Sequence, residues 1–72
     1  MDGSCPFATS YRTADDQYIV IAAIEPKFYA VLLRVLGLDE EALPAQYDSS
    51  GWAILRERFA AVIRTRTRDL WI

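Results

Sequence analysis

The chain contains no histidine, one cysteine and no long apolar run. Without histidine, no residue of the chain can act as an imidazole base. Cys5 alone can form neither an internal disulfide nor a Cys/His metal site, and it is not expected to be a nucleophile without a neighbouring base. The apolar stretches at residues 19–24 and 28–33 are shorter than the roughly 20 residues that span a membrane. We therefore expect a protein without a metal or a membrane segment, from a reducing, cytoplasmic compartment.

The charge of the chain does not favour a nucleic-acid-binding protein. The net charge is −2, acids dominate up to Asp48, and no basic stripe with interleaved aromatics is present, so a nucleic-acid role is not predicted. The arginines Arg64, Arg66 and Arg68 are interpreted as a solvated helix end, with a phosphate-binding patch as the alternative.

Apolar residues, by contrast, are abundant for so short a chain. They make up 53% of the 72 residues, although a domain of this size buries only about 60% of its unfolded surface. The excess predicts that part of the apolar surface is meant for a partner.

The residue pattern predicts a single small α+β domain over residues 1–72, with a β-hairpin followed by two helices and the start of a third. Residues 1–8 are expected to be an irregular lead-in because Pro6 disfavours strand pairing. The hairpin is expected over residues 10–23. Its second strand is apolar on both faces, which predicts a central strand covered on both sides. Since a two-stranded ribbon is marginal alone, it needs helices or a third strand from elsewhere.

Local signals place the helices. Pro26 suits the first turn of a helix over residues 26–36, and Gly37 suits its left-handed C-terminal cap. A second helix is expected over residues 51–63, capped by Ser49 or Ser50. A truncated helix start is expected at residues 67–72. The predicted apolar face of the first helix consists of Phe28, Leu32 and Leu36, with Tyr29 and Leu33 beside them. That of the second consists of Trp52, Leu55, Phe59, Val62 and Ile63.

Glu25 is the candidate functional residue. An apolar run that favours a strand ends at this carboxylate, and Pro26 follows at once. One interpretation is an acid that favours the positive end of the helix dipole, worth about 0.3–1 kcal/mol. The other is a working carboxylate held at a rigid, partly buried junction. The residues alone leave both open.

Several strings of the sequence carry a resemblance to a known family. They are Pro6-Phe7, Tyr11-Arg12-Thr13-Ala14-Asp15, Ala23-Ile24-Glu25-Pro26-Lys27-Phe28-Tyr29, Leu36-Gly37-Leu38, Leu43-Pro44, Gly51-Trp52 and Thr67-Arg68-Asp69-Leu70-Trp71. Together they resemble the small domain of the α-methylacyl-CoA racemases, within the family III CoA-transferases. The stretch from Tyr11 to Tyr29 is the most specific. Enzymes of this family are several times longer, so the resemblance implies a segment of that small domain.

The resemblance implies an isomerase of lipid metabolism that epimerises 2-methyl-branched acyl-CoA thioesters by 1,1-proton transfer. The acyl-CoA is the substrate, and no cofactor is implied. A His and an Asp on the large domain form the acid/base pair. The glutamate that matches Glu25 is expected to come from the partner subunit of an interlocked dimer and to orient the catalytic His. Because the chain lacks that pair, we expect it to be inactive alone.

The sequence departs from the family pattern at three positions. Ala22 replaces a glycine before the Ala-Ile-Glu-Pro string, Asp16 replaces the glycine of the hairpin turn, and Leu70 replaces a glutamate that would complete a capping box. Two alternatives stay open at this stage: a non-catalytic protein-interaction module, and a segment of a family III CoA-transferase.

Overall fold

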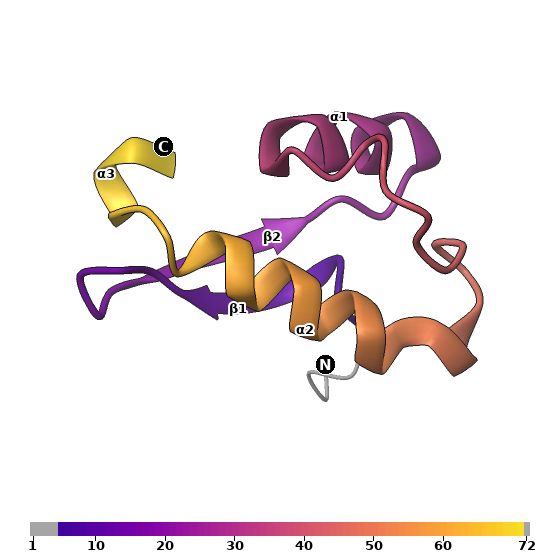
Figure 1. Ribbon diagram of the computed structural model, residues 1–72, viewed down its shortest axis with the longest axis horizontal. Coiled ribbons are helices and arrows are strands. Elements are labelled where there is room, and N and C mark those ends of the chain that lie inside the picture. The colour runs from indigo at the N-terminus through magenta and orange to yellow at the C-terminus, as the bar shows by residue number, and fades with distance from the viewer. Residues whose placement is uncertain (1–4, 72) are drawn as a thin grey trace.

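The computed structural model describes residues 5–71 and confirms the α+β fold, a hairpin followed by helices (Figure 1). Its elements are β1 (Ala8–Arg12), β2 (Tyr18–Ala22), α1 (Pro26–Leu36), the short 3-10 helix η1 (Ser49–Gly51), α2 (Trp52–Ile63) and α3 (Arg68–Trp71). Helix α2 crosses the hairpin over β1, whereas α1 and α3 lie on the side of β2. Among the described residues, no helix is long and apolar enough to cross a membrane.

The hairpin begins earlier than expected. Strand β1 starts at Ala8, which pairs with Ala22, although residues 1–8 were expected to be irregular. Pro6 lacks only its own N–H, so pairing resumes two residues later. Residues 1–4 of the expected lead-in lie outside the described part of the chain.

The turn of the hairpin forms without the family's glycine. Asp16 adopts a left-handed backbone, with φ 66°, and aspartate tolerates this conformation better than most residues. The neighbouring Asp15 accepts hydrogen bonds from the Thr13 hydroxyl (2.5 Å) and from the backbone N–H of Arg68 (3.1 Å). The hydrogen bond from Thr13 lowers the pKa of Asp15 most. These contacts tie the turn to the start of α3.

The core lies between the hairpin and α2. Phe59, Leu55 and Ile63 of α2 are fully buried, as the apolar pattern of this helix predicts. Trp52 and Val62 are only half-buried, so they lie at the margin of the core.

Helix α1 turns the expected face to the core except at Phe28, since Leu36 is buried and Leu32 packs against the core. Tyr29 and Leu36 are buried, but Phe28 is 52% exposed, so its predicted burial is wrong. The ring of Tyr29 takes the central position because it packs on Phe7 (centroid distance 5.6 Å) and Phe59 (6.3 Å).

The cap predicted for the C-terminus of α1 is present. Gly37 has φ 74°, and its N–H donates to Arg34 O at 3.1 Å. The N–H of the buried Leu38 donates to Leu33 O at 2.8 Å, which closes the turn in the Schellman arrangement.

The cap before α2 differs from the prediction. Asp48, not Ser49 or Ser50, provides the capping carboxylate. Its Oδ1 accepts from Ser50 N at 3.2 Å and from Ser50 Oγ at 2.6 Å. The cap moves upstream because the 3-10 turn precedes the α-helix, and the first orphan N–H groups belong to that turn.

Gly51 is needed at the start of α2 for steric reasons. It is buried, and a Cβ at this position would lie 2.3 Å from Pro44 Cβ. Gly51→Ala is therefore expected to lower the free energy of unfolding by about 1–3 kcal/mol, the usual cost of overpacking. Urea denaturation followed by circular dichroism measures this. The loss should shrink when Pro44→Gly removes the opposing side chain, and an equal loss in both backgrounds would contradict the steric explanation.

Two buried tyrosines differ in whether their hydroxyl groups are hydrogen-bonded. The hydroxyl of Tyr11 donates to Pro6 O at 2.5 Å, and burial raises the pKa of Tyr11 to about 12. The hydroxyl of Tyr29 is buried with no hydrogen-bond partner among the described residues, and burial raises the pKa of Tyr29 as well.

Removing each hydroxyl should therefore have opposite outcomes. Tyr11→Phe is expected to cost about 1–2 kcal/mol, whereas Tyr29→Phe should be neutral or stabilising. The folded state favours the neutral tyrosine, so the stability contributed by the raised pKa of Tyr11 is present below pH 10 and is lost as the pH rises from about 10 to 12. Urea denaturation across this range tests both points. Equal costs for the two variants, or an alkaline loss unchanged in Tyr11→Phe, would contradict them.

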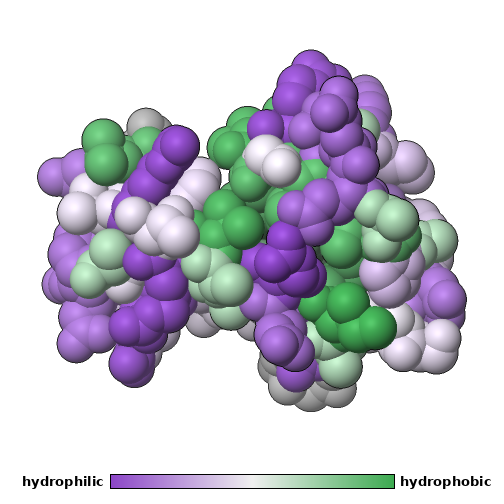
Figure 2. Space-filling model, in the orientation of Figure 1, coloured by the Kyte–Doolittle hydropathy of each residue, from purple (hydrophilic) through white to green (hydrophobic). Residues whose placement is uncertain are grey.

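The outer face of β2 remains uncovered. Ile21 lies in the core, but Val20 is 79% exposed. The prediction of a strand covered on both sides is therefore wrong for the described chain, whose sheet has two strands. Figure 2 shows hydrophobic surface reaching the exterior at the centre of the molecule, between α3 and α1. The apolar residues of β2 face both sides of the sheet, and the described elements cover only one side. The side chain of Val20 is therefore left exposed.

Candidate functional site

Glu25 lies at the junction between β2 and α1, where the sequence predicts a strand that leads into a helix. Its backbone is extended, with φ −72° and ψ 141°, and its carbonyl accepts the N–H of Tyr29 at 2.9 Å. Pro26 occupies the first turn of α1 and confines the preceding residue to this extended region. The local sequence thus fixes the direction in which the chain enters the helix.

The side chain of Glu25 is exposed and does not cap the helix by a hydrogen bond. No ion pair or hydrogen bond joins its carboxylate to another residue between Cys5 and Trp71. The carboxylate is therefore available to a donor outside the described chain.

Exposed apolar side chains lie close to Glu25 along the chain. Ile24 is 56% exposed, and Phe28, one turn into α1, is similarly exposed. The ammonium of Lys27 lies 5.3 Å from the centroid of the Phe28 ring. A partner that covered this surface would exclude water from the carboxylate, and charge-assisted hydrogen bonds are strongest in such an environment.

The two residues before Glu25 are held by a loop that precedes α2. The buried Gln46 donates from Nε2 to Ala23 O at 3.2 Å and to Ile24 O at 2.8 Å. The hydroxyl of Tyr47 also donates to Ile24 O. We call Gln46 and Tyr47 the junction clamp.

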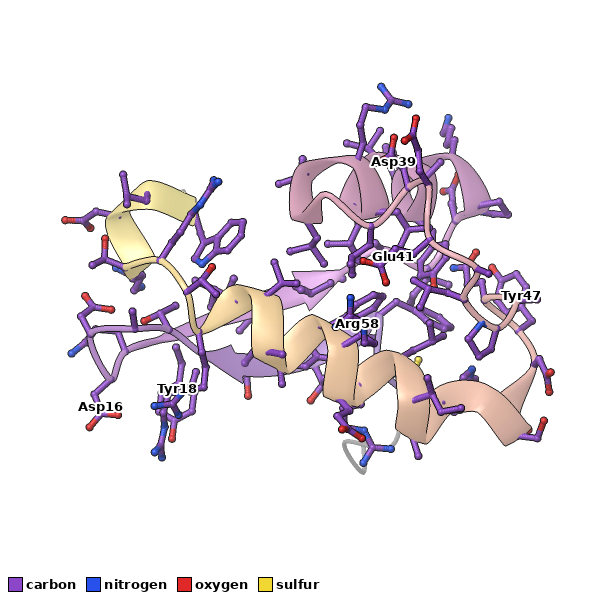
Figure 3. The ribbon with its side chains drawn as sticks, viewed as in Figure 1. Asp16, Tyr18, Asp39, Glu41, Tyr47 and Arg58 are labelled. Atoms are coloured by element: carbon purple, nitrogen blue, oxygen red, sulfur yellow. The ribbon has the colours of Figure 1, made fainter. Side chains whose placement is uncertain are left out.

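The junction clamp is itself anchored to α2. The indole N–H of Trp52 donates to Gln46 O at 2.8 Å. Further along, Arg58 binds both carboxylate oxygens of Glu41 at 2.7 Å, and Figure 3 shows these two side chains facing each other. The loop before α2 is thus fastened at two points, and the backbone leading to Glu25 is fastened to that loop.

Sequence reasoning missed the junction clamp. Gln46 and Tyr47 lie more than twenty residues from the carbonyls that they bind. No local motif signals a side-chain bond over that separation, because it depends on how the loop returns to the hairpin. Only the buried position of Gln46, which the sequence does not reveal, identifies it.

Gln46→Leu should weaken the junction, because leucine is similar in size to glutamine but has no hydrogen-bond donor. The Ala23 and Ile24 carbonyls would lose a donor, and we expect unfolding to become easier by about 1–3 kcal/mol. Tyr47→Phe, which removes a hydrogen bond at an exposed position, is the matched control and should cost less than about 1 kcal/mol. Urea denaturation measures both, and a smaller loss for Gln46→Leu than for Tyr47→Phe would contradict the larger contribution that we assign to the buried Gln46.

The arginines near the C-terminal end contact their own chain. The guanidinium of Arg66 lies 5.3 Å from the centroid of the Trp71 ring, and Arg68 Nε donates to Tyr18 O at 3.2 Å. These contacts favour the structural interpretation over a phosphate-binding patch. Cys5 is half-buried. Between Cys5 and Trp71, no group of three or more His, Cys, Asp or Glu residues is placed to hold a metal ion.

Known proteins place the chain in a family. The sequence model of CoA-transferase family III matches residues 1–72. The chain is 45% identical over 71 residues to a mouse protein named alpha-methylacyl-CoA racemase, and 41% identical to the human protein of that name. It is 35% identical to a CaiB/baiF CoA-transferase family protein of Caenorhabditis elegans. These alignments cover 96–99% of the chain but 19% of each relative. The chain therefore belongs to CoA-transferase family III.

Proposed function

We propose that the chain is part of the small domain of an enzyme that racemises 2-methyl-branched acyl-CoA thioesters by 1,1-proton transfer. The observation that carries the proposal is its similarity to two mammalian proteins named alpha-methylacyl-CoA racemase, across 99% of its length. A cytoplasmic location, which the single cysteine favours, and a role in lipid metabolism complete the proposal.

The chemistry defines what the chain contributes. A thioester acidifies its α-proton, and removal of that proton leaves a planar, enolate-like carbanion. Inversion then requires two proton carriers on opposite faces of the plane. The chain has no histidine and cannot supply the imidazole base. We assign the His/Asp pair to the large domain of the longer enzyme, as the resemblance to the racemases implies. This reaction uses the acyl-CoA substrate and requires no cofactor.

Within that reaction we assign Glu25 a positioning role. A carboxylate that accepts a hydrogen bond from one imidazole nitrogen fixes the ring's tautomer and orientation, and it raises the imidazole pKa. The exposed carboxylate of Glu25, without a partner among residues 5–71, supports this role. The apolar residues beside it support an interface with a second subunit. We therefore propose that Glu25 serves the catalytic His of the partner in an interlocked dimer.

A chimeric enzyme tests the proposal. The segment of the mouse relative that matches this chain would be replaced by residues 1–72, and the exchange of the α-proton of a 2-methylacyl-CoA with deuterated water would be followed. We expect exchange by the chimera and none by the isolated chain. A folded, dimeric chimera without exchange, or an isolated chain that catalyses it, would overturn the proposal.

Transfer of CoA between acids is the second candidate. The similarity to the Caenorhabditis elegans protein, which is named for the CoA-transferase family, favours it. It requires an aspartate nucleophile on the large domain. Incubating the chimera with an acyl-CoA and a second, isotopically labelled acid distinguishes the two. Labelled acyl-CoA without α-proton exchange would favour the transferase.

A further inference from the structure

An apolar groove runs along β2 on the side away from β1. Its volume is about 450 Å³, and its lining includes four consecutive residues, Tyr18–Ile21, together with Leu32 and Val35 of α1 and Trp71 of α3. The ribbon in Figure 1 shows α1 and α3 flanking this side of β2. Because consecutive residues of a strand point to opposite faces, a groove lined by all four follows the edge of β2.

The peptide groups at this edge have no partner. Thr13 N donates to Gln17 O, and Ala23 N donates to Phe7 O, both at 2.8 Å. Hydrogen-bonded and non-bonded pairs alternate in an antiparallel ladder, so the N–H and C=O groups of Val20 and Ala22 point away from β1. Neither residue has a recorded partner at that edge between Cys5 and Trp71.

We propose that this groove binds an extended apolar segment, which adds to the edge of β2 as a third strand. The backbone of the incoming strand satisfies the outward N–H and C=O groups of Val20 and Ala22, while its alternate side chains enter the apolar groove. Val20, 79% exposed in the described chain, becomes a residue of a central strand.

The charge at one end of the groove indicates which residue the incoming strand should carry. Arg68 lines it at the Tyr18 end, where its Nε is bonded to Tyr18 O and its terminal nitrogens have no recorded partner among the described residues. The strand should therefore carry an acidic residue at this end, because a carboxylate matches the guanidinium. Since 19% of each relative is matched, sequence outside that segment is available to supply the strand, and we commit to this source over a second copy of the chain.

Peptide binding tests the proposal directly. Overlapping synthetic peptides that cover the mouse relative outside the matched segment would be titrated against the 72-residue chain, with Trp71 and Trp52 fluorescence as the readout. We expect saturable binding by a peptide that alternates apolar residues and carries an acid. Its N-methylation at alternate peptide groups should abolish binding, and Arg68→Gln should weaken binding at least about tenfold, as loss of a charge-assisted pair implies. Val31→Asp, at an exposed position of α1 outside the groove, should bind as the parent does.

Hydrogen exchange in the chimeric enzyme gives an independent test that does not depend on activity. The amide hydrogens of Val20 and Ala22 should be protected like that of Ile21. Rapid exchange at both positions would overturn the proposal, as would failure of every peptide to bind. Dimerisation of the chain through β2, detected by sedimentation and lost in Val20→Pro, would assign the groove to a second copy instead and would equally overturn it.

Discussion

Replacing Phe59 by alanine is expected to unfold the chain. Phe59 is fully buried on α2, and its ring lies 6.3 Å from the rings of both Tyr11 and Tyr29, measured between centroids. It thereby joins β1, α1 and α2. Truncating a buried phenylalanine costs about 3–5 kcal/mol. A small domain has a total stability of about 5 kcal/mol or more, so this change removes most of the stability of so short a chain.

Thermal and urea denaturation followed by circular dichroism measure the effect. Ile54→Ala is the matched control, since Ile54 lies on the same helix but is 53% exposed. It should change the free energy of unfolding by less than about 0.5 kcal/mol, as surface substitutions usually do. If the two variants lost equal stability, Phe59 would not be the centre of the core.

The second large effect concerns activity. In the chimeric enzyme, Glu25→Gln is expected to lower kcat by about 100-fold with little change in KM, because in the role proposed here Glu25 orients the catalytic imidazole and does not bind substrate. In the proposed role, the carboxylate also raises the pKa of the imidazole. Its removal should therefore shift the acidic limb of the pH–rate profile to lower pH.

Stability separates this role from a structural one. The Glu25 carboxylate has no partner among residues 5–71, so Glu25→Gln should leave the melting temperature of the isolated chain unchanged. Glu57→Gln, which alters an exposed acid on α2, should change neither kcat nor the pH profile. If Glu25→Gln lowered the melting temperature of the isolated chain as well as the activity of the chimera, the carboxylate would be structural.

Local signals account for the parts of the fold that the sequence predicts correctly. Pro26 and Gly37 act within one turn of the helix that they delimit, and the spacing of Leu55, Phe59 and Ile63 defines one face of a helix. The position of Glu25 at the strand–helix junction depends on the same kind of signal. Each of these features can be predicted from residues that lie close together along the chain.

The features that the sequence did not reveal depend on distant contacts. Phe28 is displaced from the core by Tyr29, whose ring meets Phe7 and Phe59. Gln46 reaches carbonyls 22 and 23 residues away. The exposure of Val20 depends on which elements pack around β2. The pattern of apolar residues within β2 does not reveal this.

Subunit complementation tests the central claim most directly. One chimeric subunit would carry Glu25→Gln, and the other would lack the histidine of the large domain. Each homodimer should be nearly inactive. If Glu25 serves the histidine of the opposite subunit, the mixed dimer contains one intact site of two, and its α-proton exchange should rise to about half that of the unmodified chimeric dimer. If the mixed dimer remains as inactive as the homodimers, Glu25 does not act across the interface and the account is wrong.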